Sequence, residues 1–101
     1  MPLKLNQTSK FIVQAFNALG DETRFKILQV LSSSNEICVS QIAKSLGITT
    51  AGTSQHLKIL EQAGLIERQR MGQRTCYIIK PSRKIHQEII NVTLKVKDSN
   101  E

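Results

Sequence analysis

The chain has 101 residues, a formal net charge of +6, 40% hydrophobic residues and 22% charged residues. This composition is ordinary for a single folded domain and too apolar for an intrinsically disordered chain. Two cysteines are too few for a secreted scaffold held by disulfides, and no stretch approaches the roughly 18 apolar residues of a membrane span. The length predicts one domain over residues 1–101. Because no apolar run near the N-terminus resembles a signal peptide, we expect the protein to be located in the cytoplasm.

The first third of the chain predicts two helices. Apolar residues at helical spacing follow a stretch without periodicity, and a Gly-Asp pair stands where one helix should end and the next begin. In chain order we expect a flexible arm over residues 1–7, a helix capped by Thr8 or Ser9 and ending at Leu19, a helix over residues 22–31 capped by Asp21, and a loop over residues 32–35.

The middle of the chain predicts a helix-turn-helix. After a short apolar run at residues 37–39, we expect Ser40 to begin a short helix and Gly47 to end it. Thr49 is expected to cap a longer helix over residues 50–63. Two helices joined by so tight a turn are typical of helix-turn-helix DNA-binding domains.

The last third predicts a β-hairpin and a final helix. Residues 65–70 and 75–79 have the composition of strands and flank a turn at residues 71–74. Ser82 is expected to cap the final helix, whose apolar residues recur at heptad-like spacing, and residues 97–101 form a polar tail. The predicted fold is mostly α with a small β-hairpin, a winged helix-turn-helix in the order α-α-α-α-β-β-α.

The excess positive charge lies in one segment of the chain. Residues 44–84 contain eight basic and two acidic residues, whereas the rest of the chain contains six of each. A polyanionic partner such as double-stranded DNA explains this clustering directly, and a basic surface that only aids solubility is the alternative.

The helix over residues 50–63 is the candidate recognition helix. When its apolar stripe faces the core, Gln55 faces outward and can pair bidentately with adenine in the major groove. No acidic residue lies between Glu36 and Glu61, so no carboxylate on this surface repels phosphates. An ordinary solvated helix face is the alternative. The residues expected to contact DNA in this region are Gln41, Thr49, Thr50, Ala51, Ser54, Gln55, His56 and Lys58.

The hairpin is a second candidate contact with DNA. Alternation along the strand places Arg68 and Arg70 on one face, and Gln73 and Arg74 lie at the glycine turn. Arginine at a hairpin tip grips phosphates or enters a narrow minor groove. A charged edge strand that prevents aggregation is the alternative, and both roles are compatible. We therefore expect a wing over residues 68–76 that contacts the DNA backbone or the minor groove.

The sequence lacks the arrangements that catalysis requires. It contains no Ser-His-Asp set, no phosphate-cradling glycine loop and no close pair of carboxylates. His56 lies beside the apolar stripe of its helix, and it either donates to a phosphate or packs as a partly buried histidine. We therefore expect a protein without enzymatic activity or cofactor. A winged helix that docks onto another protein is the remaining alternative.

Residues 16–79 resemble the ArsR/SmtB family of winged-helix repressors. The ordered set of matching pieces, which covers about two thirds of the chain, comprises residues 17–24, 27–28, 36–39, 42–43, 46–47, 54–60, 63–66 and 72–77. The resemblance implies a homodimer through the first and last helices, a palindromic DNA operator and repression relieved by an effector. The apolar stripe of the last helix, which has no obvious partner in so short a chain, separately favours the dimer. The expected interface residues are Ile12, Phe16, Ile85, Ile89, Val92 and Val96.

The same resemblance argues against the family's known metal sites. Arsenic-sensing members resemble one another in a pair of cysteines beside the third helix, whereas here Cys38 is followed two residues later by Ser40. A single soft ligand does not hold a soft metal ion. Zinc-sensing members have carboxylate and histidine ligands on the last helix, where this chain has Pro81, Arg83, Leu94 and Lys97. We therefore expect no metal site.

Cys38 and Cys76 form a candidate redox pair. Cys38 lies in the apolar run before the third helix, and Cys76 lies in the second strand of the hairpin. These segments pair in many winged helices, so a thiol-redox-responsive repressor is an alternative function. Two separate buried thiols are the more common arrangement.

Overall fold

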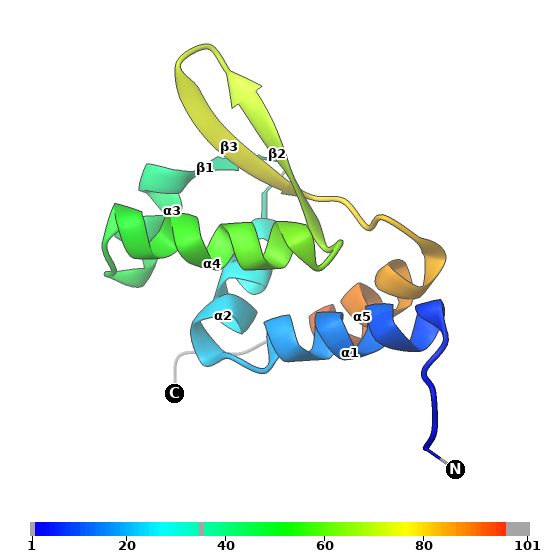
Figure 1. The fold of residues 1–101 in the computed structure, drawn as a ribbon. Helices are drawn as coiled ribbons and strands as arrows, with labels where there is room; N and C mark the ends of the chain where they lie inside the picture. The colour runs from blue at the N-terminus through cyan, green and yellow to red at the C-terminus, as the bar shows by residue number, and fades with distance from the viewer. Residues whose placement is uncertain (1, 35, 97–101) are drawn as a thin grey trace.

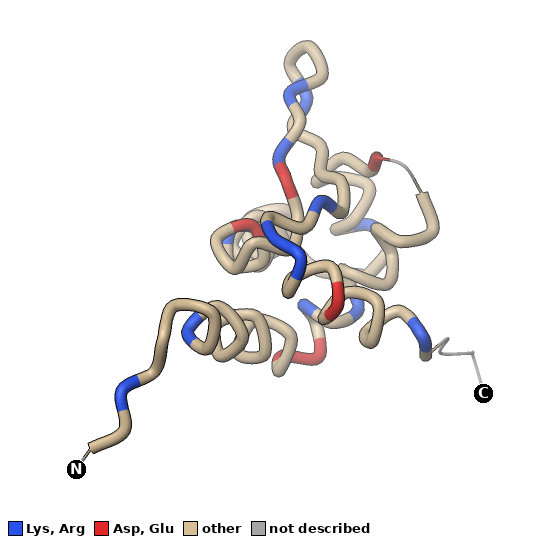
Figure 2. Tube along the Cα trace, turned by 90° about the vertical axis from the view of Figure 1, so that its right-hand side faces the viewer, with Lys and Arg blue, Asp and Glu red and all other residues tan. Residues whose placement is uncertain are grey.

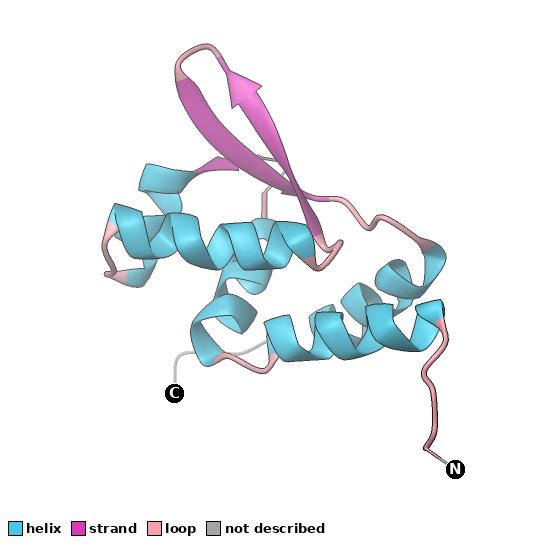
Figure 3. Cartoon of the chain, in the orientation of Figure 1, coloured by secondary structure: helices cyan, strands magenta, loops and turns pink. Residues whose placement is uncertain are grey.

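The computed structural model describes residues 2–34 and 36–96, which form five helices and one three-stranded sheet (Figures 1 and 3). The sequence-based prediction of a winged helix-turn-helix is confirmed, with one further short strand before the third helix. Met1, Asn35 and the predicted tail of residues 97–101 lie outside the described residues. In chain order the elements are α1 (Gln7–Leu19), α2 (Glu22–Ser32), β1 (Ile37–Cys38), α3 (Val39–Leu46), α4 (Thr50–Gln62), β2 (Ile66–Met71), β3 (Arg74–Ile79) and α5 (Lys84–Leu94).

One aliphatic core joins the helices to the base of the hairpin. Each fully buried leucine or isoleucine contributes about 1.5–3 kcal/mol relative to an exposed side chain. Helix α4 lies across the centre of the molecule and buries Thr53, Leu57 and Leu60, which form the inward-facing stripe of this helix. The largest buried aliphatic side chains are Ile27, Leu28, Leu31, Ile42, Leu57, Leu60, Leu65 and Ile90.

Side-chain caps define where three helices begin. Asp21 accepts a hydrogen bond from the backbone N–H of Arg24 at 3.0 Å, and Thr49 accepts one from Gly52 at 3.0 Å, as predicted. The predicted cap of α1 at Thr8 or Ser9 is wrong. Asn6 Oδ1 accepts from the Ser9 N–H at 2.8 Å, so α1 begins at Gln7 and the arm ends one residue earlier.

The short helix α3 also begins earlier than the sequence indicated. Its first residue is Val39 rather than Ser40, so the preceding strand ends at Cys38. The carboxamide oxygen of Gln41 accepts a hydrogen bond from the Cys38 N–H at 2.9 Å, which stabilises this start. Gly47 ends α3 with φ of +67°, which confirms its predicted role as the helix stop.

The start and end of α5 differ from the prediction. Ser82 does not cap the helix, because its N–H donates to the carbonyl of Gly64 at 2.9 Å and the N-cap position falls on Arg83. The Arg83 guanidinium lies over the Phe11 ring, 4.0 Å from its centroid, which ties this helix start to α1. Since α5 ends at Leu94, Val96 lies beyond the helix in which it was predicted.

The sheet is antiparallel, with the strand order β1-β3-β2. Strands β2 and β3 pair from Ile66 opposite Ile79 to Met71 opposite Arg74. Strand β2 is displaced by one residue from its predicted range of 65–70, whereas β3 begins one residue before its predicted range of 75–79 and ends at the predicted residue. We call β2, β3 and the turn at residues 72–73 the wing. It projects from the body above α4, while α1 and α5 lie side by side at the other end of the molecule (Figure 1).

The turn between α4 and β2 packs directly against α5. Gly64 has φ of +82°, and a Cβ atom at this position would lie 2.8 Å from Nε2 of His86. His86 is only 1% exposed and its ring lies 5.6 Å from that of Phe11. This contact joins the turn after α4 to the α1–α5 pair.

Candidate nucleic-acid interface

Helix α4 separates a buried face from an exposed polar face. Thr53, Leu57 and Leu60 are buried, and the exposed side chains of its first three turns include Thr50, Ala51, Ser54, Gln55 and Lys58. The Thr53 hydroxyl donates to the carbonyl of Thr49 at 2.8 Å, which adds a second bond to the capped first turn. A helix end fixed in this way presents Ser54 and Gln55 on a rigid scaffold.

The wing presents exposed basic side chains toward its tip. Arg68 and Arg70 on β2 and Arg74 on β3 are exposed, and Gln73 lies in the turn between the strands. None of the ion pairs between residues of the described segments involves these three arginines. At the base of the wing, Lys80 pairs with Glu67 at 3.2 Å. Figure 2 shows Lys and Arg positions along the projecting hairpin, so its positive charge extends away from the body.

A cleft of about 470 Å³ separates the wing from α4. One wall consists of Thr50, Ser54 and Lys58, and the opposite wall includes Arg68 and Arg74. The start of α3 closes one side, and Glu61 is the acidic residue in the lining. The two predicted DNA-contacting elements therefore face a common groove and present three cations to it.

Tyr77 is a buried residue of the core that also belongs to the cleft lining. It pairs with Arg68 across the β2–β3 ladder and lines the groove. Burial raises the pKa of the Tyr77 hydroxyl, with Glu61 acting in the same direction and Arg68 against it. At neutral pH the group is therefore a neutral hydrogen-bond donor.

Two of the predicted DNA contacts are engaged elsewhere in the protein. The carboxamide oxygen of Gln41 accepts the Cys38 N–H, and His56 is half-buried with its Nδ1 4.0 Å from Asp21 Oδ2. The same Nδ1 lies 3.3 Å from Nη1 of Arg24. The structure thus favours the alternative in which His56 packs under its helix, directed at the start of α2. Neither residue lines the cleft. The other predicted DNA contacts outside its lining are Thr49, Ala51, Gln55, Arg70 and Gln73.

Arg24 was not identified from the sequence as an organising residue. Its Nε donates to the carbonyl of Ala18 at 2.6 Å, and its backbone N–H bonds to the Asp21 carboxylate. That N–H bond lowers the pKa of Asp21 below its ordinary value of 3.8, and the charges of Arg24 and His56 act in the same direction. Burial of the carboxylate opposes this shift without cancelling it. The sequence shows only that Arg24 stands three residues after the capping Asp21. Its contact with His56 of α4 depends on the tertiary fold and is not visible in the sequence.

The candidate dimer residues divide into exposed and packed groups. Phe16, Val92 and Val96 are 59%, 65% and 55% exposed. Ile12 and Ile85 are half-buried against the core, and Ile89 is buried within the protomer at 7% exposure. Val13, which is 54% exposed one turn before Phe16, was missed although its spacing places it on the same helix face.

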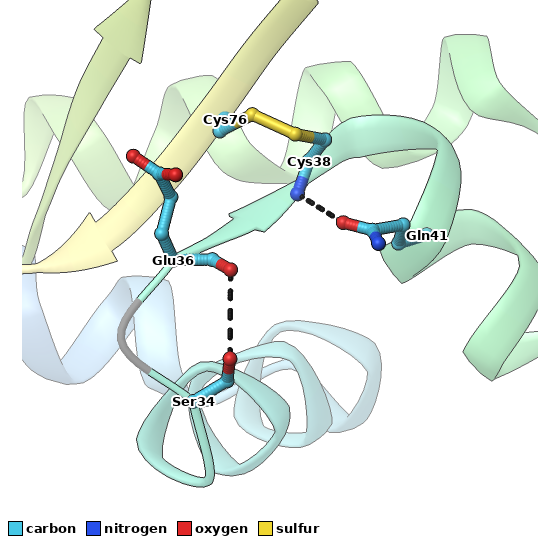
Figure 4. The surroundings of a disulfide bond; sticks show 5 residues. All are labelled: Ser34, Glu36, Cys38, Gln41 and Cys76. Carbon is cyan, nitrogen blue, oxygen red and sulfur yellow. Dashed lines mark hydrogen bonds between the residues drawn. A yellow bond between two sulfur atoms is a disulfide. The ribbon is translucent and has the colours of Figure 1, made fainter. Parts of the chain in front are cut away.

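Cys38 and Cys76 are joined by a disulfide in the structure (Figure 4). The two residues are direct partners in the β1–β3 register, which confirms that the two segments pair. Residues 2–34 and 36–96 contain no group of three or more His, Cys, Asp or Glu side chains that could hold a metal ion. Of the positions compared with zinc-sensing proteins, Lys97 lies outside the described residues.

No helix in the described part of the chain has the length and apolar character needed to span a membrane.

Comparison with known proteins places this architecture among bacterial regulators. The family model described as "Bacterial regulatory protein, arsR family" matches residues 21–68, from the cap of α2 to the first half of β2. A Staphylococcus aureus protein named "Cadmium resistance transcriptional regulatory protein CadC homolog" is 36% identical, over 65% of this chain and 54% of that protein. The chain thus spans about half the length of the CadC proteins that it matches.

Two further comparisons cover more of the matched protein. The Bacillus subtilis "Uncharacterized HTH-type transcriptional regulator YbzH" is 37% identical, over 64% of this chain and 79% of that protein. The structure of HlyU from Vibrio cholerae superposes with a TM-score of 0.76 at 25% identity, covering 90% of this chain and 96% of that one. From the fold, the family match and these relatives, the chain belongs to the ArsR family of bacterial regulatory proteins.

Proposed function

We propose that this chain is a homodimeric, sequence-specific DNA-binding repressor that acts in the cytoplasm without catalysing a reaction. The observation that supports this proposal best is the common cleft, to which α4 and the wing present Lys58, Arg68 and Arg74. Family membership supports the same function, since a relative that is 33% identical is named "Arsenical resistance operon repressor".

In the proposed complex, α4 lies in the major groove with its N-terminal turns against the base edges. Gln55 forms a bidentate pair with adenine, and Ala51 contacts a thymine methyl group. The Ser54 hydroxyl donates a hydrogen bond to a base or accepts one from it. The wing arginines grip phosphates or enter the adjacent minor groove, which fixes the register of the helix.

The proposed dimer forms through the exposed apolar side chains of α1 and α5. Two copies related by a two-fold axis present two recognition helices, so the proposed operator is palindromic, with half-sites about one helical turn apart. Occupation of such an operator blocks transcription. The proposal assigns no metal effector.

Selection of binding sequences from random duplex DNA tests this function. We expect a palindromic consensus. The logarithm of the binding constant for the selected duplex should fall linearly with the logarithm of the salt concentration, with a slope of about −0.9 for each phosphate contact. The competing function is docking onto another protein, for which the chain would bind duplex DNA at no salt concentration. Absence of binding to all duplexes in dilute salt would overturn the proposal.

A further inference from the structure

The disulfide lies where the helix-turn-helix meets the wing. Cys38 is the residue immediately before α3, the first helix of the helix-turn-helix, and Cys76 is in β3 of the wing. Cys38 also lines the cleft that α4 and the wing share. The bond therefore connects β3 of the wing to the start of α3, the helix that precedes α4 in the helix-turn-helix (Figure 4).

Few other contacts hold the outer wing to the body. Strand β1 pairs with β3 at two positions, Ile37 opposite Tyr77 and Cys38 opposite Cys76, and the second is the last pair toward the tip. Beyond Cys76, the residues from Arg70 to Arg74 are exposed and pair only within the hairpin. Without the bond, the base of the wing stays in the core through Tyr77, while the tip gains freedom that DNA binding would have to remove.

The two cysteines differ in their position relative to the cleft. Cys38 is 8% exposed and belongs to the cleft lining, whereas Cys76 is fully buried and does not. A small thiol that enters the cleft therefore approaches the bond from the Cys38 side.

We propose that the Cys38–Cys76 bond is a reversible thiol–disulfide switch that sets DNA affinity, with the bonded form binding more tightly. The proposal rests on the proposed function, because it concerns regulation of the same cleft. Its partner is a low-molecular-weight thiol and the corresponding disulfide, a chemical class that fits the cleft by size.

The exchange proceeds in two balanced steps. A small thiolate attacks the Cys38 sulfur, the S–S bond breaks, and its electron pair leaves on Cys76, which takes up a proton. A second small thiolate attacks the small molecule's sulfur in this mixed disulfide, and Cys38 leaves as a thiolate that is then protonated. Two small thiols are thereby oxidised to one small disulfide while the protein disulfide is reduced to two thiols. A small disulfide drives the reverse, beginning with attack by the Cys38 thiolate.

The test measures DNA binding and wing order across a series of reduced and oxidised glutathione ratios. The protein is the full chain, and the probes are its selected duplex and a scrambled duplex of equal length. Alkylation followed by mass spectrometry gives the bonded fraction at each ratio. We expect the fully bonded protein to bind the selected duplex about tenfold more tightly, within the usual range for coupled sites.

Cys38→Ser and Cys76→Val serve as variants that cannot form the bond. Both should bind like the reduced wild type and ignore the glutathione ratio, and circular dichroism verifies that they fold. Hydrogen exchange of the wing-tip amides, measured without DNA, should be slower in the bonded wild type than in either variant.

The proposal and the proposed function fail in different ways. Equal affinity of the bonded and reduced forms, tighter binding by the reduced form, or the absence of a bond at every ratio would overturn the switch while leaving DNA binding intact. Loss of DNA binding in both redox states would overturn the proposed function and the switch with it.

Discussion

The molecule has two exposed surfaces of opposite character. Around the cleft, α4 and the wing expose hydroxyl, amide and guanidinium groups that water solvates well. On the α1–α5 pair, the exposed side chains include Phe16 and Val92, with 59% and 65% of their area open. The first surface gains by meeting a polyanion, and the second gains by removing apolar area from water. The proposed contacts with DNA and with a second copy of the chain thus lie on separate surfaces, which α4 and the Gly64 turn connect.

The largest effect should follow from placing a charge on the apolar surface. Val92→Asp would bury two unpaired carboxylates near the two-fold axis of the proposed dimer, which should weaken association by about 10³-fold or more. Sedimentation equilibrium measures the dimer constant. The same substitution at Ile59, which is 41% exposed on α4, is the control and should leave the oligomeric state unchanged. If the Val92→Asp variant dimerised as tightly as the wild type, the dimer interface would have to lie on another face of the molecule.

A strong effect on folding is expected at the joint between the two surfaces. Gly64→Ala adds a methyl group 2.8 Å from Nε2 of His86 at φ of +82°, and we expect it to lower the free energy of unfolding by about 3 kcal/mol. Gly47→Ala is the matched control, because its φ is +67° but no atom lies within 4 Å of the added methyl group. It should cost about 1 kcal/mol. Urea denaturation compares them, and equal losses would show that the His86 contact is unimportant.

Within the DNA-binding surface, the wing and the helix should behave differently. Arg74→Ala should weaken binding to all duplexes about tenfold and reduce the salt slope by about one, as expected for a phosphate contact. Gln55→Ala should reduce discrimination among bases at one position of each half-site, by about 1–3 kcal/mol. Lys26→Ala removes an exposed cation on α2 that pairs with Glu22, and it serves as the control for net charge. Fluorescence anisotropy with selected and scrambled duplexes measures all three.

The smallest expected effect concerns pH and the buried histidine at the joint. Burial, reinforced by the nearby Arg83, lowers the pKa of His86 below its ordinary value of 6.5 in the folded protein. Above that value His86 is neutral in both states and contributes nothing to the pH dependence. Below pH 6.5, His86 is protonated in the unfolded chain while it is still neutral in the folded protein. The free energy of unfolding should therefore decline as pH falls from about 6.5.

His86→Leu provides the comparison for this pH dependence. Denaturation at pH 7.5 and pH 5.5 should show a smaller loss for the variant than for the wild type. Asp21, whose pKa is also lowered, adds its own loss only near pH 4 and lower, so the two contributions separate. An identical pH dependence in both proteins would mean that His86 is protonated without penalty.

The sequence predicted best those features that local chemistry determines. Asp21 and Thr49 cap helices as expected, and Gly47 ends one, because each acts on a backbone group within a few residues. The competing caps Asn6 and Thr8 are of equivalent type, so propensity did not separate them. Ser82 failed as a cap because its N–H bonds to a residue eighteen positions away, which local pattern does not contain.

The candidate site was predicted in its elements but not in its contacts. Periodicity identified the exposed side of α4, yet the direction of His56 depends on Arg24, which comes from another helix. The heptad-like spacing of α5 included Ile89, which packs into the protomer because α5 has core neighbours on more than one side. The Cys38–Cys76 bond likewise depends on the β1–β3 register, which no short motif fixes.

The bond between Cys38 and Cys76 also makes a covalent ring from the chain, and its two ends are 38 positions apart in the sequence. That ring contains all of α3, α4 and β2 and continues into β3. A single proteolytic nick at the Gly47 turn or the Gly72 turn would leave both fragments attached to each other. The cleaved protein would remain one covalent species, heavier by one water, and it would divide into two fragments only after a thiol had been added.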